Sequence, residues 1–99
     1  MDYELAQLID ASTVLTDRQK EELSKLLERM PLGDKVKLKK IFLKEHELLQ
    51  EYYRDLGEIK KRSAEKKIKT IYSHTENMVQ KVETHELDAL EDELNALQA

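Results

Sequence analysis

The chain of 99 residues contains no cysteine, only one proline and only two glycines. The lack of cysteine excludes a disulfide framework, a thiolate metal site and a cysteine nucleophile, and it favours a reducing, cytoplasmic location. Few prolines and glycines, together with a charged fraction of 38%, favour long helices with solvated faces over turn-rich sheets.

Long hydrophobic runs are also missing. No window approaches the roughly 18 uninterrupted apolar residues of a membrane-spanning helix, and the first ten residues lack the basic and apolar regions of a signal peptide. We therefore expect neither export nor membrane insertion. The length fits one domain with a modest core, so we expect a single helical domain over residues 1–99.

Charge is distributed unevenly along the chain, although the net charge is only −4. Residues 1–34 carry eight acids and four bases, residues 35–69 carry twelve bases and six acids, and residues 83–99 carry six acids and no base. We expect the acidic carboxy-terminal segment to lie beside the lysines of the basic middle and to neutralise them.

Local signals predict the first two helices. Apolar residues at helical spacing predict a helix over residues 2–11. Thr16 and Gln19 form a capping-box pattern, in which each side chain satisfies a backbone donor at a helix start, so a second helix is predicted over residues 17–30. Pro31 disfavours helical geometry in the residue before it and ends that helix.

A third helix is predicted over residues 35–82, after a turn at Leu32 and Gly33 and a cap at Asp34. The stretch contains no proline and one glycine, which permits an uninterrupted helix. At 1.5 Å per residue it would reach roughly 72 Å, far more than the width of a compact domain of this size. Shorter helices must therefore fold back over its apolar stripe.

The apolar stripe of this third helix changes phase halfway along. The stripe over residues 41–63 and the stripe over residues 64–82 both follow 3/4 spacing, but the second is rotated by roughly a quarter turn. We expect the two halves to face different neighbours. Helix 17–30 would cover the first half, and a last helix over residues 85–98, capped by Thr84, would cover the second.

A competing interpretation breaks the long helix at Gly57, which would act as a left-handed cap after Leu56 and give a compact four-helix bundle. We favour the continuous helix, because Glu58 and Ile59 continue the amphipathic pattern and a mid-helix glycine costs only about 1 kcal/mol. The predicted fold class is all-α: a long central helix with shorter helices folded back on each end, as a helical hairpin or coiled-coil-like bundle.

Candidate chemistry is sparse. None of His46, His74 and His85 is spaced to share a metal ion with another histidine on one helix face. Most serines and threonines occupy capping or helix-surface positions, and both glycines stand alone, so no nucleophilic centre or phosphate-binding loop is indicated. We expect no enzymatic activity, no metal and no cofactor.

The apolar surface of the residues around Phe42 is broader than one short helix can cover, which indicates a partner or self-association face. We predict a non-enzymatic helical scaffold or adaptor that acts through protein contacts, as a homodimer. The predicted interface consists of Ile41, Phe42, Leu48, Leu49, Tyr52, Leu56 and Ile59.

An alternative is a nucleic-acid-binding helical module that uses the basic stretch 60–69, namely Lys60, Lys61, Arg62, Lys66, Lys67 and Lys69. These side chains do not share one side of a helix, and an acidic helix is available in the same chain, so nucleic acid is the less favoured partner. A third hypothesis, a fragment or designed bundle without a biological partner, predicts a stable monomer.

The segment Leu15 to Leu23, LTDRQKEEL, is followed by Leu26-Leu27, by Met30-Pro31 and then by a long charged helix. This pattern resembles short uncharacterised helical proteins of candidate-phyla bacteria of the Patescibacteria type. The resemblance covers about the first half of the chain. It implies a small cytoplasmic bacterial protein with no assigned activity and transfers no functional residue.

Overall fold

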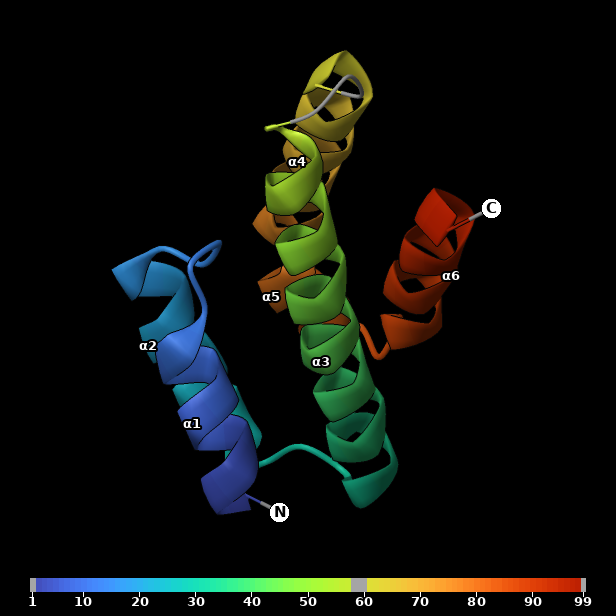
Figure 1. The fold of residues 1–99 in the computed structure, drawn as a ribbon. Helices are drawn as coiled ribbons and strands as arrows, with labels where there is room; N and C mark the ends of the chain where they lie inside the picture. The colour runs from blue at the N-terminus through green and yellow to red at the C-terminus, as the bar shows by residue number, and fades with distance from the viewer. Residues whose placement is uncertain (1, 58–60, 99) are drawn as a thin grey trace.

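The computed structural model describes residues 2–57 and 61–98, and every regular element within them is helical (Figure 1). The long central helix α3 packs against α1, α4 and α6. The predicted all-α fold, with a long central helix covered by shorter ones, is confirmed. The helices are α1 (Asp2–Ala11), α2 (Asp17–Leu27), α3 (Leu32–Asp55), α4 (Lys61–Glu76), α5 (Met78–Glu83) and α6 (Leu87–Gln98).

The single helix predicted over residues 35–82 is wrong. α3 ends at Asp55, a turn occupies Leu56 and Gly57, and α4 packs back against α3. The longest dimension of the molecule is 45 Å, well short of the roughly 72 Å that the continuous helix requires. The competing interpretation placed the break correctly, but Gly57 does not have the positive φ of a left-handed cap.

The start of α2 confirms the predicted capping box. The hydroxyl of Thr16 accepts a hydrogen bond from the backbone N–H of Gln19 at 3.2 Å, and the Gln19 side chain accepts one from the Thr16 N–H at 2.9 Å. These bonds satisfy two donors that a helix start leaves unpaired. At its other end α2 stops at Leu27, earlier than the predicted Met30.

The predicted turn at Leu32 and Gly33 is also wrong, because these residues open α3. Pro31 is the residue before the first turn, and its carbonyl accepts a hydrogen bond from the Lys35 N–H at 3.0 Å. A proline ring lacks a backbone N–H and fixes φ, so it is well tolerated where a helix begins. Asp34 lies inside the first turn instead of capping it.

Thr84 does not open the last helix as predicted; it closes α5. The N–H of Glu86 donates to the Lys81 carbonyl at 2.8 Å, and the N–H of His85 donates to the Val82 carbonyl at 3.2 Å. These paired bonds form a Schellman closure, which needs a left-handed residue at the position of His85. His85 adopts that conformation, with φ of 59°, so α6 starts after it.

The partners of the flanking helices differ from those expected. α1, not α2, packs on α3, while α2 packs on α1 and α5. Ion pairs fix the direction of α1, because Lys35 contacts Asp2 at 2.7 Å and Lys39 contacts Glu4. α6 packs mainly on α3 and also on α4 and α5, on the side of α3 away from α1 and α2 (Figure 1).

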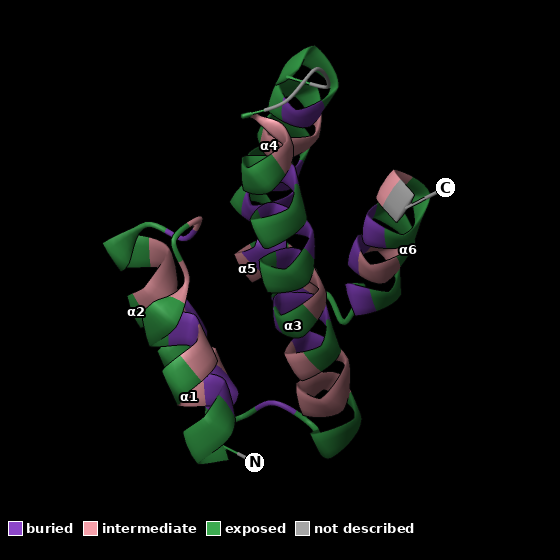
Figure 2. Cartoon of the chain, in the orientation of Figure 1, coloured by how far each residue is buried: buried purple, intermediate pink, exposed green. Residues whose placement is uncertain are grey.

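The core runs between the helices, and buried positions face inward along each one (Figure 2). The stripe predicted over residues 64–82 is buried at Ala64, Ile71, Thr75, Met78 and Val82. The stripe over residues 41–63 falls mainly on α3, and the stripe over residues 64–82 falls on α4 and α5. No helix in the described part of the chain is both long and apolar enough to cross a membrane.

Candidate functional site

The residues predicted as an interface between two chains mostly lie inside one chain. Five of them are at most 6% exposed in the core, Leu56 is half-buried, and Ile59 lies outside the described residues. The buried five are Ile41, Phe42, Leu48, Leu49 and Tyr52. This set is therefore not a free surface of the folded chain, because the helices packed on α3 cover it.

A groove of about 580 Å³ lies between the end of α1, residues 12–14 and α3. Leu43 and Tyr53, at its border, are 49% and 48% exposed, so part of its apolar lining faces solvent. The apolar lining residues are Leu8, Ala11, Val14, Phe42, Leu43, Leu49 and Tyr53, and the polar ones are Ser12, Thr13, Glu45, His46 and Gln50.

The wall opposite α3 is held by a local turn. The Ser12 hydroxyl accepts hydrogen bonds from the backbone N–H groups of Val14 and Leu15, each at 3.3 Å. Leu15 is buried and anchors the turn to the core. Serine favours such turns because its hydroxyl can bond the backbone two or three residues on. The chain thus leaves α1 at Ala11 without covering the carboxy-terminal part of α3.

Glu45, one of the groove residues, is a buried acid on the apolar stripe of α3, with a side chain only 2% exposed. Its Oε1 lies 3.0 Å from Nε2 of His74, close enough for an ion pair. The alignment is poor, and neither carboxylate oxygen has a hydrogen-bond partner among the described residues. Burial raises the pKa of Glu45, and His74 opposes that rise only in part.

His74, on α4, joins three helices. Its Nδ1 lies 2.8 Å from Oε2 of Glu93 on α6, and its other ring nitrogen faces Glu45 on α3. Burial alone would lower the pKa of His74, but the close contacts with the carboxylates of Glu45 and Glu93 together raise it. We call Glu45, His74 and Glu93 the buried charge cluster, in which Glu45 and His74 are buried and Glu93 forms the exposed edge.

The geometry of this cluster limits its chemistry. The two carboxylates approach opposite edges of the His74 ring, so the three side chains do not converge on one point. No group of three or more His, Asp or Glu side chains in the described ranges is arranged to hold a metal ion. Both ring nitrogens face carboxylates, so neither is directed at a hydroxyl that it could activate.

The sequence pattern indicated no metal site at His74 and did not single out Glu45. A signal was available for Glu45, because it occupies the 3/4-spaced position between Ile41 and Leu48 on a stripe that is otherwise apolar. An acid at such a position is buried when both neighbours on the stripe are buried, and such an acid needs a partner. The partner itself, on another helix, could not be identified from spacing.

The basic stretch lies on α4 and is not neutralised as predicted. Lys61, Arg62, Lys66 and Lys69 are exposed, and Lys60 lies outside the described residues. Lys67 is half-buried, with its Nζ 5.3 Å from the centre of the Tyr52 ring.

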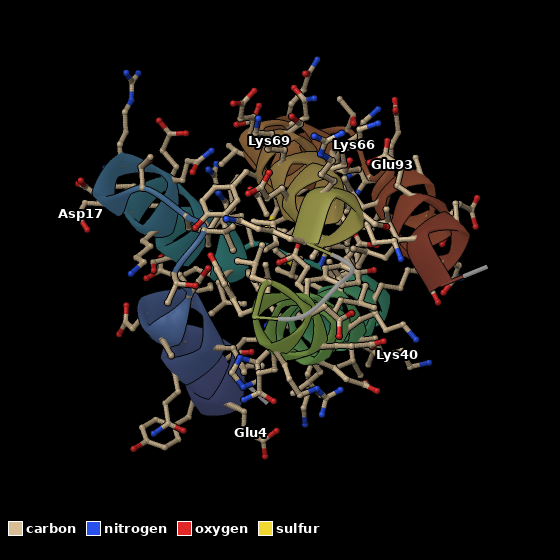
Figure 3. The ribbon with its side chains drawn as sticks, turned by 45° about the horizontal axis from the view of Figure 1, so that its top comes forward. Glu4, Asp17, Lys40, Lys66, Lys69 and Glu93 are labelled. Carbon is tan, nitrogen blue, oxygen red and sulfur yellow. The ribbon has the colours of Figure 1, made fainter. Side chains whose placement is uncertain are left out.

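The acids of α6 pair elsewhere: Asp88 contacts Lys37 at 2.9 Å, and Glu93 contacts His74. Figure 3 shows Lys66, Lys69 and Glu93 along the edge where α4 lies next to α6. This proximity produces no ion pair between α6 and the basic stretch within the described residues, so the predicted neutralisation is not found there. Asp88 of α6 does pair with Lys37, a lysine of the basic middle.

The groove and the buried charge cluster meet at Glu45, and these two features are the candidate functional site. The resemblance to helical proteins of candidate-phyla bacteria stays a prediction. Comparisons with protein-family models, with curated proteins and with solved structures find no match to this chain, so the site is interpreted from its geometry.

Proposed function

We propose that the chain is a non-enzymatic helical adaptor that holds a segment of another protein in the groove between α1, residues 12–14 and α3. The groove itself carries the proposal, because its lining is mostly apolar and yet partly open to solvent. Isolated exposed apolar residues are ordinary on protein surfaces, but Leu43 and Tyr53 border one groove whose volume falls in the range of binding sites.

The shape of the groove supports a peptide segment over a compact ligand. Its α3 wall runs from Phe42 to Tyr53, which corresponds to roughly 16 Å along a helix axis, or about three turns. An amphipathic helix of similar length presents apolar side chains at helical spacing and can place them along such a wall. The partner segment is therefore a short amphipathic helix.

Self-association is the competing use of the same groove, since the sequence predicted a homodimer. Size exclusion coupled to light scattering separates the two uses. We expect a monomer for wild type, because the predicted interface is buried within one chain. A dimer that Leu43→Lys disperses would instead identify the partner as a second copy of the chain.

The direct experiment selects ligands from a displayed library of random twelve-residue peptides on the wild-type protein. We expect recovered peptides to lose about tenfold or more in affinity on Leu43→Lys, which places a charge at the groove border. The matched control is Leu32→Lys, because Leu32 is 67% exposed on the same helix but does not line the groove. Equal losses on both variants, or no peptide sensitive to Leu43→Lys, would refute the groove as the binding face.

A second candidate function, nucleic-acid binding, is favoured by one observation: Lys61, Arg62, Lys66 and Lys69 are exposed and form no ion pair within the described residues. Fluorescence anisotropy with single-stranded and duplex oligonucleotides tests it. Phosphate contacts predict binding that weakens steeply between about 50 and 200 mM salt and that Lys66→Gln with Lys69→Gln reduces further. No binding at the lower salt concentration excludes this candidate.

A further inference from the structure

We propose that the segment held in the groove carries a lysine or arginine side chain that pairs with Glu45. This inference rests on the proposed function, because it names the chemistry of the segment that the groove would hold. It also accounts for a buried acid at the groove: Glu45 lines the groove, while its carboxylate points to His74 across the closed core.

The carboxylate of Glu45 lacks hydrogen-bond donors within the part of the chain that the structure describes. Glu45 is 2% exposed, and neither of its oxygens has a hydrogen-bond partner among the described residues. A buried carboxylate without aligned donors is costly, and a donor brought in by a ligand removes that cost. A lysine or arginine head group supplies donors together with the opposite charge.

Glu45 can change its partner, because His74 still has Glu93 as a second partner. His74 keeps its contact with Glu93, at 2.8 Å, when the Glu45 carboxylate rotates toward the groove. Neutral His74 then donates its Nδ1 proton to Glu93. The incoming cation thus takes the place of the poorly aligned His74 contact, and no charge is left unpaired.

A carboxylate at the groove also affects which partner segments the groove selects. Apolar side chains in the rest of the groove favour any apolar segment, whereas one carboxylate discriminates strongly between a cation and an uncharged side chain. Among the described residues, Glu45 is the one acid that lines the groove, so the basic residue of the partner has a fixed place along it. The partner is then an amphipathic helix with one basic residue within its apolar stripe.

The experiment is a double-mutant cycle with a groove-selected peptide. Replacing the basic residue of the peptide by methionine is expected to weaken binding to wild type by about tenfold or more. The same replacement should change binding to Glu45→Gln by less than about twofold, because the charge partner is already gone. Glu47→Gln is the matched control, since Glu47 is exposed on α3 close to Glu45 and does not line the groove, and it should behave as wild type.

The outcomes separate this inference from the proposed function. Peptides that depend on Leu43 but contain no basic residue, or a methionine replacement that weakens binding equally on wild type and Glu45→Gln, overturn the pairing and leave the groove in place. Failure to recover any Leu43-dependent peptide overturns both. The composition of the selected peptides decides the question even if Glu45→Gln does not fold, because wild type alone is needed for the selection.

Discussion

The two sides of α3 differ in how completely they are covered. Toward α4 and α6 the core is closed and contains the buried charge cluster, whereas toward α1 a groove remains open. Leu48 and Leu43 lie on the same helix, yet Leu48 is 2% exposed and Leu43 is 49% exposed. On one amphipathic helix, some apolar residues are therefore buried and stabilise the fold, whereas others stay exposed and can contact a partner.

The largest effect is expected from removing a leucine on the closed side. Leu48→Ala leaves a cavity in the core and should lower the free energy of unfolding by about 2–5 kcal/mol. Leu43→Ala, at the groove border, should change it by less than about 0.5 kcal/mol. Urea denaturation followed by circular dichroism measures both, and similar losses for the two variants would abolish the distinction between the two sides.

The buried charge cluster makes the stability of the closed side depend on pH. The pKa values of His74 and Glu45 are both raised in the folded chain, so the folded state binds protons more tightly than the unfolded state. The contribution of His74 is therefore complete below the ordinary histidine pKa of about 6.5 and is lost as pH rises through its higher folded value. The contribution of Glu45 is complete below the ordinary carboxyl pKa and is lost as pH rises through the higher pKa of the folded chain.

We accordingly expect the free energy of unfolding of wild type to fall as pH rises above about 6.5, and the fall to be much smaller when His74→Gln is combined with Glu45→Gln. Both substitutions are needed, because His74→Gln alone leaves Glu45 buried with a raised pKa. Denaturant titrations at several pH values provide the measurement. His46→Gln is the control, because His46 is exposed and should leave the fall intact. A fall of equal size in the double variant would show that Glu45 and His74 are not its source.

A smaller effect is expected at the capping box that fixes the end of the groove wall. Thr16→Ala removes the acceptor for the Gln19 N–H and should lower the free energy of unfolding by about 1 kcal/mol. Thr70→Ala serves as the control, since Thr70 bonds within α4 and lies away from the groove. If the cap also orders the wall, Thr16→Ala weakens binding of groove-selected peptides and Thr70→Ala does not.

The smallest effect is expected at His85, where a left-handed backbone closes α5. His85→Gly relieves the strain of a non-glycine residue at this φ, a gain of at most about 1 kcal/mol, and removes an exposed contact with Asp34 at 2.7 Å. We expect a small net rise in thermal midpoint by calorimetry. A clear decrease would show that the contact between His85 and Asp34 outweighs the backbone strain.

The sequence predicted local structure where a short-range signal exists. The capping box at Thr16 gave the start of α2, and the 3/4-spaced stripe between Ala64 and Val82 gave buried positions of α4 and α5. The break after Asp55 was missed because Glu58 and Ile59 continue the amphipathic pattern and Gly57 lacks the conformation of a glycine cap. The phase change between the two stripes lies inside α4 and does not mark the break.

The candidate site was harder to predict because it depends on contacts between helices. Phe42 and Leu49 were selected as partner-binding residues, and they do line the groove, but Ile41, Leu48, Tyr52 and Leu56 do not. The groove exists because α1 ends before it covers the whole of α3, and the pairing of Glu45 with His74 depends on the chain reversal. Neither feature follows from the periodicity of one helix.

The central claim, that the open side of α3 is the binding surface, is tested most directly by nuclear magnetic resonance. Amide chemical shifts of the ¹⁵N-labelled wild-type chain are followed during titration with a groove-selected peptide. We expect the largest chemical-shift changes at residues 8–14 and 42–53, which enclose the groove. Largest changes on α4 and α6, with residues 8–14 unaffected, would contradict it.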